Sequence, residues 1–324
     1  GGLRQDLVTP AADEDDALER ATRGRVVAGE VAGIPELHPG DASPRGTNSV
    51  LPLSKRTYRA RTAATEDDVD ALGPQVTEEI RRRIKSADPH LDADLADWRD
   101  PACTRPKVTL LGPVSVTAQG PLPERSPRRS WNTEVVAYLV TRPNGALSER
   151  LGAELWPGEA DITGKTKVRQ AVAIVRKWLG EDPNGQEYLP KGTTSGVSQG
   201  IARYQIVNSL LDAELFRRLR LRGLASGEDG IDDLWAALDL VVGVPFDQRR
   251  PGGYGWLAET PLDHEYSAMI IDTAHTLATH HLAAGQPARA VDAAQVALRA
   301  GSSEDTPLLD LMIAFDAQGN RAEG

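Results

Sequence analysis

Residues 163–180 carry the clearest periodic pattern of apolar and polar positions in the chain. Apolar side chains recur there at i, i+3, i+4, i+7, i+10 and i+11, which places them in one stripe along a helix. They are Val168, Ala171, Val172, Val175, Trp178 and Leu179. Thr163 can cap the start of this helix, and Gly180 can end it. The pattern therefore predicts an amphipathic helix over this stretch.

The opposite face of this predicted helix is rich in cations and has no carboxylate. Its members are Lys165, Thr166, Lys167, Arg169, Gln170, Ala173, Arg176 and Lys177. Taken alone, such a face is also typical of a basic surface helix with no ligand. The surrounding sequence favours a different interpretation, in which this helix lies in the major groove of DNA.

Two shorter amphipathic segments precede this helix. Asn132 can cap a helix that runs through residues 135–139, and Ser148 can cap a second one over residues 148–156. A short connection, residues 159–162, then leads to the third helix. Two helices, a tight connection and a third amphipathic helix are typical of a helix-turn-helix.

Strand-like segments flank the three helices. Residues 107–117 have a strand pattern interrupted by Pro113, which implies an edge position, a bend or a hairpin turn. Residues 188–190 and 203–207 are predicted as two strands around a Gly/Ser/Thr-rich loop, with Lys191 at its base. Such a hairpin after the third helix is typical of a wing.

The rest of the chain is predicted mainly helical. Helices are expected near residues 215–219, 234–241, 263–284, 288–300 and 306–318, with a loop over residues 243–255. Short helices joined as antiparallel pairs are typical of a helical-repeat array. Upstream, residues 76–85 and 91–98 predict two short amphipathic helices. We expect Leu91, Leu95 and Trp98 to dock onto the domain that follows.

The length of 324 residues indicates more than one domain. We assign residues 1–74 to a linker rich in Gly, Pro and charge, and residues 75–106 to a helical lead-in. Residues 107–207 form the predicted winged helix-turn-helix domain, and residues 208–324 form the helical array. The predicted fold class is mostly α with a small β component.

The charge of the chain is unevenly distributed. The net charge of −10 argues against nucleic-acid binding when the chain is taken as a whole. Residues 107–207, however, hold 13 basic and 9 acidic residues, whereas residues 208–324 hold 9 basic and 18 acidic ones. The only positive third of the chain therefore contains the cationic helix, which keeps attraction to phosphate local.

No catalytic, cofactor or metal site is predicted. Gly164-Lys165-Thr166 lacks the glycine that a phosphate-binding loop requires five residues earlier, where Glu159 stands. His275, His280 and His281 lack the i, i+4 spacing of a metal pair, and His275 is predicted to pair with Asp272 on the helix surface. The single Cys103 excludes an internal disulfide and a cysteine-based zinc site.

The sequence also lacks the signals of a membrane or secreted protein. No apolar run reaches the roughly 18 residues that a membrane span needs, and no signal peptide is recognisable. We therefore expect no membrane insertion by these residues and a cytoplasmic location. Because the chain begins Gly-Gly-Leu without Met, we interpret it as a piece of a longer protein.

An ordered set of segments resembles the bacterial transcriptional activator domain family of actinobacterial regulators, similar to the antibiotic regulatory proteins. The segments are VTLLGPVSV, VVAYLVTRPNGALSERLGAELWPGEA and TKVRQAVAIVRKWLG, then LWAALDLVVGVPF, YGWLAE and LATHHLAAGQPARAVDAAQVAL. The resemblance covers residues 107–318 and implies a winged helix followed by a tetratricopeptide-like array. LDADLADW also resembles a subgroup with a LysM module and membrane segments upstream. The short array and the long, weakly charged wing loop depart from the family pattern.

The resemblance implies that the third helix is the recognition helix on double-stranded DNA. By position, Arg169, Gln170, Ala173, Arg176 and Lys177 would face the duplex, with Arg169 and Gln170 as base readers. The residues expected to hold phosphates are Lys165, Lys167, Arg128, Arg129, Lys191 and Arg203. For Arg128, Arg129 and Arg203, plain solvated charge is the alternative.

Two functions follow from these observations. The first is a DNA-binding transcriptional regulator whose helical array forms a homodimer or binds a partner protein. The alternative is a protein-interaction module, the cytosolic part of a membrane-anchored LysM protein, in which the winged helix does not bind DNA. No enzyme activity is expected, because no catalytic constellation is present.

Overall fold

The computed structural model describes residues 86, 88–121, 126–158, 161–192, 202–301 and 304–319. This part of the chain is mostly helical with a small sheet, as the sequence predicts. The predicted linker 1–74 and the predicted helix 76–85 lie outside the described residues. We refer to residues 107–207 as the first half and to residues 208–319 as the second half.

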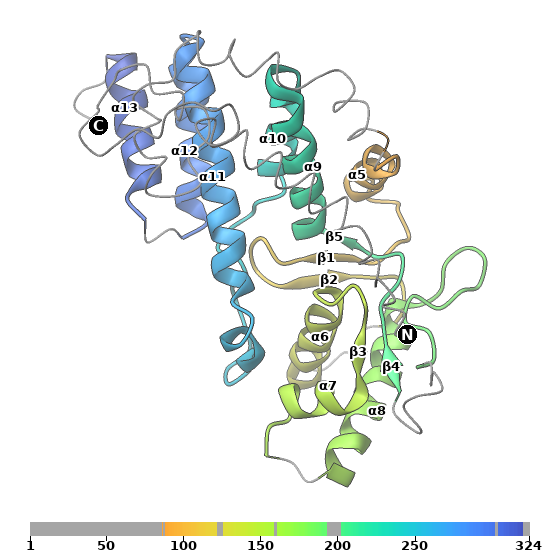
Figure 1. Ribbon diagram of the computed structural model, residues 1–324. Helices are drawn as coiled ribbons and strands as arrows, with labels where there is room; N and C mark the ends of the chain where they lie inside the picture. Colours follow the sequence, from red (N-terminus) through yellow and green to blue (C-terminus); the bar gives the residue numbers. More distant parts are fainter. Residues whose placement is uncertain are drawn as a thin grey trace, which may run out of the picture.

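Three helices form the body of the first half (Figure 1): α6 (Ser126–Val140), α7 (Ser148–Leu155) and α8 (Asp161–Leu179). The predicted apolar stripe of α8 is buried in full, and Val168, Val175 and Trp178 are almost without solvent exposure. Gly180 ends the helix with a φ of +78°, a left-handed conformation that favours glycine. The periodicity thus fixed the buried side of α8 correctly.

The predicted helix starts are wrong at three positions. Helix α7 begins at Ser148 with Leu147 at the cap position, so Ser148 is the first residue of the helix and not its cap. Helix α8 begins at Asp161, so Thr163 lies inside its first turn rather than at its cap. Helix α6 begins at Ser126, and Asn132 is a buried residue of its interior. The extra turns of α6 bring Trp131 onto Trp156, with parallel rings 5.4 Å apart. Tertiary packing of this kind extends a helix beyond what its local capping signals indicate.

The segment 107–117 is a hairpin, one of the three outcomes that Pro113 implied. Strand β1 (Lys107–Thr109) pairs antiparallel with β2 (Ser115–Thr117), and Val108 faces Val116. On its other side β1 pairs in parallel with β5 (Leu210–Leu211). The sheet therefore combines two strands of the first half with one strand of the second half.

The predicted wing has a different strand partner. Strand β4 (Arg203–Tyr204) pairs with β3 (Ala146–Leu147), between α6 and α7, and not with residues 188–190. One hydrogen bond from the Val207 amide to the Tyr188 carbonyl, 2.9 Å, joins the two predicted strands. Strand β3 was missed because two residues are too few for a recognisable alternation.

Six helices make up the rest of the described chain. In the second half they are α9 (Asp212–Ser226), α10 (Ile231–Leu238), α11 (Leu262–Ala283), α12 (Pro287–Arg299) and α13 (Thr306–Gln318), close to the predicted ranges. Short 3-10 turns over Gly227–Gly230 and Gly255–Ala258 precede α10 and α11. Helices α11, α12 and α13 lie side by side (Figure 1). Helix α5 (Leu91–Arg99) contacts α9, and its Leu91 and Leu95 are buried. It therefore docks, but onto the second half and not only onto the predicted domain 107–207 that follows it in the chain.

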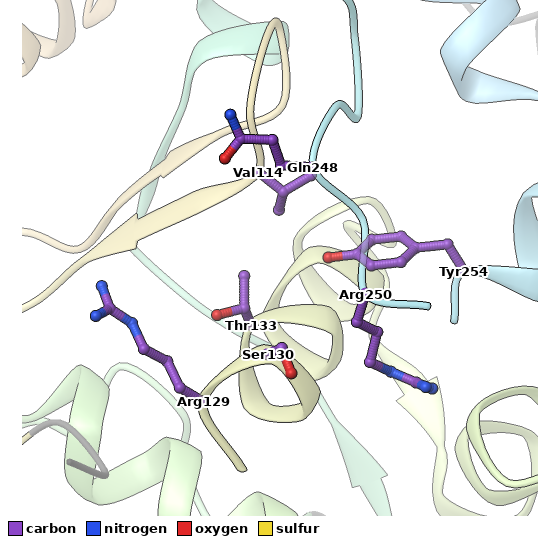
Figure 2. Close-up of a pocket in the computed structure, with 7 residues that line it drawn as sticks. All are labelled: Val114, Arg129, Ser130, Thr133, Gln248, Arg250 and Tyr254. Atoms are coloured by element: carbon purple, nitrogen blue, oxygen red, sulfur yellow. The ribbon is translucent and has the colours of Figure 1, made fainter. Parts of the chain in front are cut away.

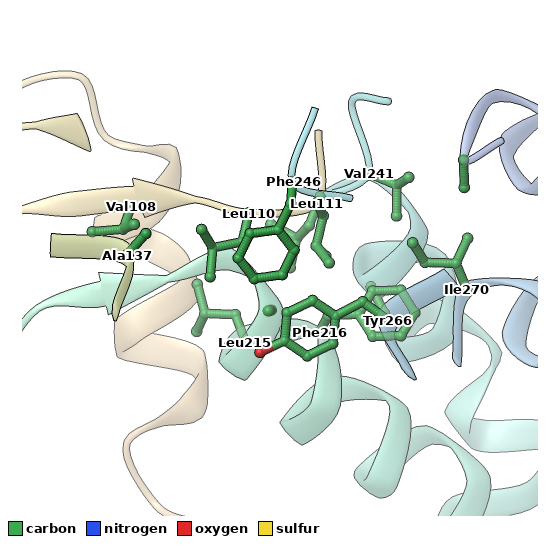
Figure 3. Close-up of a cluster of buried hydrophobic side chains, with 14 of the residues drawn as sticks. Val108, Leu110, Leu111, Ala137, Leu215, Phe216, Val241, Phe246, Tyr266 and Ile270 are labelled. Atoms are coloured by element: carbon green, nitrogen blue, oxygen red, sulfur yellow. The ribbon is translucent and has the colours of Figure 1, made fainter. Parts of the chain in front are cut away.

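The β1–β2 hairpin lies between the two halves (Figure 1). Its Leu110 and Leu111 are fully buried among side chains of the second half, including Phe216 and Phe246 (Figure 3). The buried apolar residues of both halves form one continuous cluster. The boundary near residue 207 therefore does not separate two cores.

A buried carboxylate from each half accepts hydrogen bonds from the backbone of the other. Asp212, at the start of α9, accepts from the amides of Leu110 and Leu111, each at 2.8 Å. In the opposite direction, Glu134 of α6 accepts from the Tyr254 amide and from the Arg250 guanidinium. Backbone amides of the hairpin turn and of the loop before α11, which lie outside helices and strands, thereby have the hydrogen-bond acceptors that a buried amide requires.

The loop between α10 and α11 is strained where it meets the first half. Phe246, Gln248 and Tyr254 have φ values of +57°, +55° and +60°, a region that non-glycine residues avoid. Each such residue costs roughly 1–3 kcal/mol and persists only where surrounding contacts compensate. The Phe246 amide donates to the Leu110 carbonyl, and the Asp247 carbonyl accepts from the Val114 amide. These hydrogen bonds to the hairpin help to hold the loop in its strained form.

Asp212→Asn should lower the free energy of unfolding by about 1–3 kcal/mol, because an amide NH2 replaces one of two acceptor oxygens. A buried backbone N–H is then left without an acceptor. Urea unfolding followed by circular dichroism measures the change. Asp239→Asn, at an exposed position, is the control and should stay within about 0.5 kcal/mol of wild type. Equal stability of both variants would contradict the role given to Asp212.

Candidate nucleic-acid interface

Helix α8 presents most of the predicted cationic face to solvent. Lys165, Thr166, Arg169, Gln170, Ala173 and Lys177 are exposed, and Lys167 is half-buried. This orientation follows from the buried stripe on the other side, which packs against α6 and α7. Because the packing of the buried stripe fixes the rotation of α8 about its axis, the polar side chains on the opposite face point in a defined direction.

The outward face is long enough for a DNA groove. Lys165 and Lys177 are twelve residues apart, which corresponds to about 18 Å along a helix at 1.5 Å per residue. The segment 163–179 carries no carboxylate. The Nζ atom of Lys165 lies 3.5 Å from Glu149 of α7, in a pair that is about half exposed on both sides. Such exposed pairs are weak, so this contact leaves Lys165 able to exchange Glu149 for a phosphate.

Arg176 does not join this outward face. Its Nε donates to the Leu189 carbonyl at 2.7 Å, and a second guanidinium nitrogen donates to the Pro190 carbonyl at 3.2 Å. Glu187 lies 3.3 Å from the same guanidinium. The segment that follows the helix thus crosses beside this position and engages the side chain. This geometry corrects the predicted orientation of Arg176, which here fixes the chain that leads to Lys191.

The cations predicted outside α8 fall into two groups. Arg128 and Arg129 are exposed in the first turns of α6, and Lys191 is exposed beyond the end of α8. Arg203, by contrast, donates to the Asn144 carbonyl at 2.9 Å and so holds the turn between α6 and β3. The Arg203 guanidinium is therefore hydrogen-bonded to the backbone, which contradicts the alternative that this side chain is only a solvated charge.

A stack of three side chains supports the connection between α7 and α8. The Arg250 guanidinium lies 3.3 Å from the centre of the Trp131 ring, and Trp131 stacks on Trp156. Trp156 directly follows α7, at the start of the connection to α8. No sequence pattern indicates this contact, because Arg250 is 119 positions from Trp131 and neither residue belongs to a periodic pattern.

His275 has a different partner from the predicted one. Its Nδ1 lies 2.7 Å from a carboxylate oxygen of Asp310 on α13, and both side chains are buried. The helix-surface pair with Asp272 was wrong, because α13 covers this side of α11. Within the described residues, no group of histidine, cysteine or acidic side chains could hold a metal ion. No helix in the same part of the chain has the length and apolar character needed to cross a membrane.

Comparisons of the chain with known protein families and with curated proteins find no match. The function is therefore argued from the geometry and chemistry of the residues themselves.

Arg176→Met should lower the free energy of unfolding by about 1–3 kcal/mol, because it removes a charged donor from two backbone carbonyls. The neighbouring exposed Lys177→Met should change stability by no more than about 0.5 kcal/mol. Urea unfolding of both variants compares the two positions directly. A larger loss of stability for Lys177→Met than for Arg176→Met would contradict the structural role given to Arg176.

Proposed function

We propose that this protein is a DNA-binding transcriptional regulator and that α8 enters the major groove of double-stranded DNA. The observation that carries the proposal is the outward face of α8, which combines cations and an amide on a helix whose opposite side is fully buried. A major groove about 12 Å wide admits one α-helix. In this proposal the fold is a winged helix-turn-helix followed by a tetratricopeptide-like array. The resemblance to bacterial transcriptional activator domain regulators supports the same assignment.

The exposed side chains divide into two roles. Arg169 and Gln170 read bases, since arginine pairs with guanine and glutamine with adenine through two hydrogen bonds each. Ala173, one turn further on, allows close approach of the helix to the base edges. The phosphate contacts, which set orientation but carry no sequence information, come from Lys165, Lys167, Lys177, Arg128, Arg129 and Lys191. The proposed location is the cytoplasm, where the duplex is accessible.

The test measures binding to duplexes selected from a random pool, by fluorescence polarisation between about 50 and about 200 mM salt. Affinity should fall steeply and linearly on logarithmic axes as salt rises, because phosphate contacts release counterions. Arg169→Ala should cost about 1–3 kcal/mol and relax the preference at one base position. Lys191→Ala should weaken binding to all sequences alike and reduce the salt slope by about 1.

Arg299→Ala is the matched control, since Arg299 is an exposed cation on α12 and outside the proposed interface. Its affinity should equal that of the wild type. Equal loss on every sequence for Arg169→Ala would make Arg169 a phosphate contact. Absence of salt-dependent binding to any selected duplex would contradict the regulator function.

A second candidate function is protein interaction through the last helix. Leu308, Met312 and Ile313 of α13 are exposed at 51%, 50% and 45%, which is high for large apolar side chains. A homodimer that buries this face would also present two α8 helices to DNA, as dimeric regulators do. The acidic second half is unsuited to binding DNA by itself.

Sedimentation equilibrium tests this second candidate. The wild type should associate into dimers at micromolar concentration, and Met312→Lys should remain monomeric, because it buries a charge in the apolar contact. Ala317→Lys, also exposed on α13, is the control outside this cluster and should leave association unchanged. A wild type that stays monomeric at all concentrations would exclude the homodimer.

A further inference from the structure

A pocket of about 390 Å³ lies where the two halves meet (Figure 2). One wall comes from the first turns of α6, one from the hairpin, and one from the strained loop between α10 and α11. The residues that line it are Val114, Arg129, Ser130, Thr133, Gln248, Arg250 and Tyr254. Its volume is within the range of small-molecule sites, which occur preferentially at junctions of this kind.

The chemistry of the lining is that of an anion site. Arginine, hydroxyl and amide groups surround the space, and no carboxylate is among its lining residues. Arg250 also lines the pocket, but its charge is matched by Glu134. Arg129 is exposed and has no carboxylate within ion-pair distance among the residues that the structure describes. It therefore supplies the positive charge that a bound anion would neutralise.

Tyr254 adds a hydrogen-bond donor from the opposite wall. Its side chain is 4% exposed, and its hydroxyl end reaches toward Thr133 of α6 (Figure 2). Burial raises the pKa of Tyr254, so the hydroxyl stays protonated at neutral pH. The aromatic ring and Val114 add apolar surface beside these polar groups. The pocket thus offers donors for an anionic group and apolar contacts for an organic part.

The backbone strain of the loop is concentrated at this pocket. Gln248 and Tyr254 line it, and Phe246 lies two residues before Gln248; all three have positive φ. Strained non-glycine residues cluster at ligand clamps and active sites. Lining chemistry and strain are two separate observations: the lining favours an anionic ligand, and the strain marks the loop as a ligand-binding segment.

We propose that this pocket binds a small phosphorylated organic molecule, with its phosphate on Arg129 and the hydroxyls of Thr133 and Tyr254. Gln248 and Val114 contact the organic part. Such a ligand joins α6 to the loop of the second half and stabilises their contact. The pocket shares Arg129 with the proposed DNA interface, so binding of the small ligand is measured without a duplex.

Isothermal titration calorimetry of the full chain without DNA tests this site. The probes are ribose 5-phosphate, inorganic phosphate, ribose and citrate at constant ionic strength. Ribose 5-phosphate should bind saturably and ribose should not. Arg129→Gln should weaken binding at least about tenfold, since it removes a charge-assisted contact. Arg128→Gln is the matched control, because Arg128 is exposed in the same turn but does not line the pocket.

Tyr254→Phe provides a second variant, because it removes only the hydroxyl and keeps the buried ring. It should weaken binding several-fold with an unchanged circular dichroism spectrum. Equal affinity for inorganic phosphate and ribose 5-phosphate would support the phosphate site and identify free phosphate as a sufficient ligand. No saturable binding of either phosphate, preference for citrate, or equal losses in Arg128→Gln and Arg129→Gln would overturn the proposal. None of these failures would affect the DNA assignment, which is measured with separate ligands.

Discussion

The contact between the two halves of the molecule depends on two buried carboxylates. Each half contributes one, and it accepts hydrogen bonds from irregular backbone of the other half. Glu134 is 1% exposed and binds the Arg250 guanidinium and the Tyr254 amide, and Asp212 is fully buried and binds the hairpin amides. A buried carboxylate is costly unless hydrogen bonds and a counter-charge compensate it. Both sites provide such hydrogen bonds, and that of Glu134 also provides a counter-charge. The hairpin and the strained loop consequently keep their shape only while the halves remain in contact, which makes the continuous core a mutual requirement.

This junction also positions the candidate DNA-binding helix. Arg250, which binds Glu134, lies over Trp131, and Trp131 stacks on Trp156 at the connection to α8. Stacked aromatic rings and a guanidinium above them restrict the orientation of all three groups. Arg250 of the second half thereby belongs to the stack at the connection to α8, although it is not part of the outward face of that helix.

The buried faces of individual helices could be predicted from the sequence, because apolar positions repeat along each helix. Contacts with a second, distant segment could not be predicted. Six apolar positions with helical spacing defined the buried side of α8, and Leu91 and Leu95 defined the docked side of α5. The same periodicity placed Arg176 on the polar face, yet residues 187–190 cross there and engage its guanidinium. A helical pattern carries no information on which distant segment covers a polar position. Glu134, Asp212 and the pocket were beyond prediction for the same reason, since their partners are about 100 or more positions away in most contacts.

The distribution of ion pairs explains how an acidic chain can present a cationic surface. In the second half, Arg218 pairs with Asp88 and Asp94, Arg222 with Asp92 and Asp233, and Arg249 with Asp263. Those guanidiniums are matched by carboxylates and add little field at a distance. On α8, Arg169 and Lys177 have no carboxylate within ion-pair distance among the described residues, and Lys165 has only a half-exposed one. At physiological salt a field extends about 8 Å, so the acidic helices beyond that distance do not cancel it. The positive potential therefore depends on local pairing, and the net charge of the whole chain does not determine it.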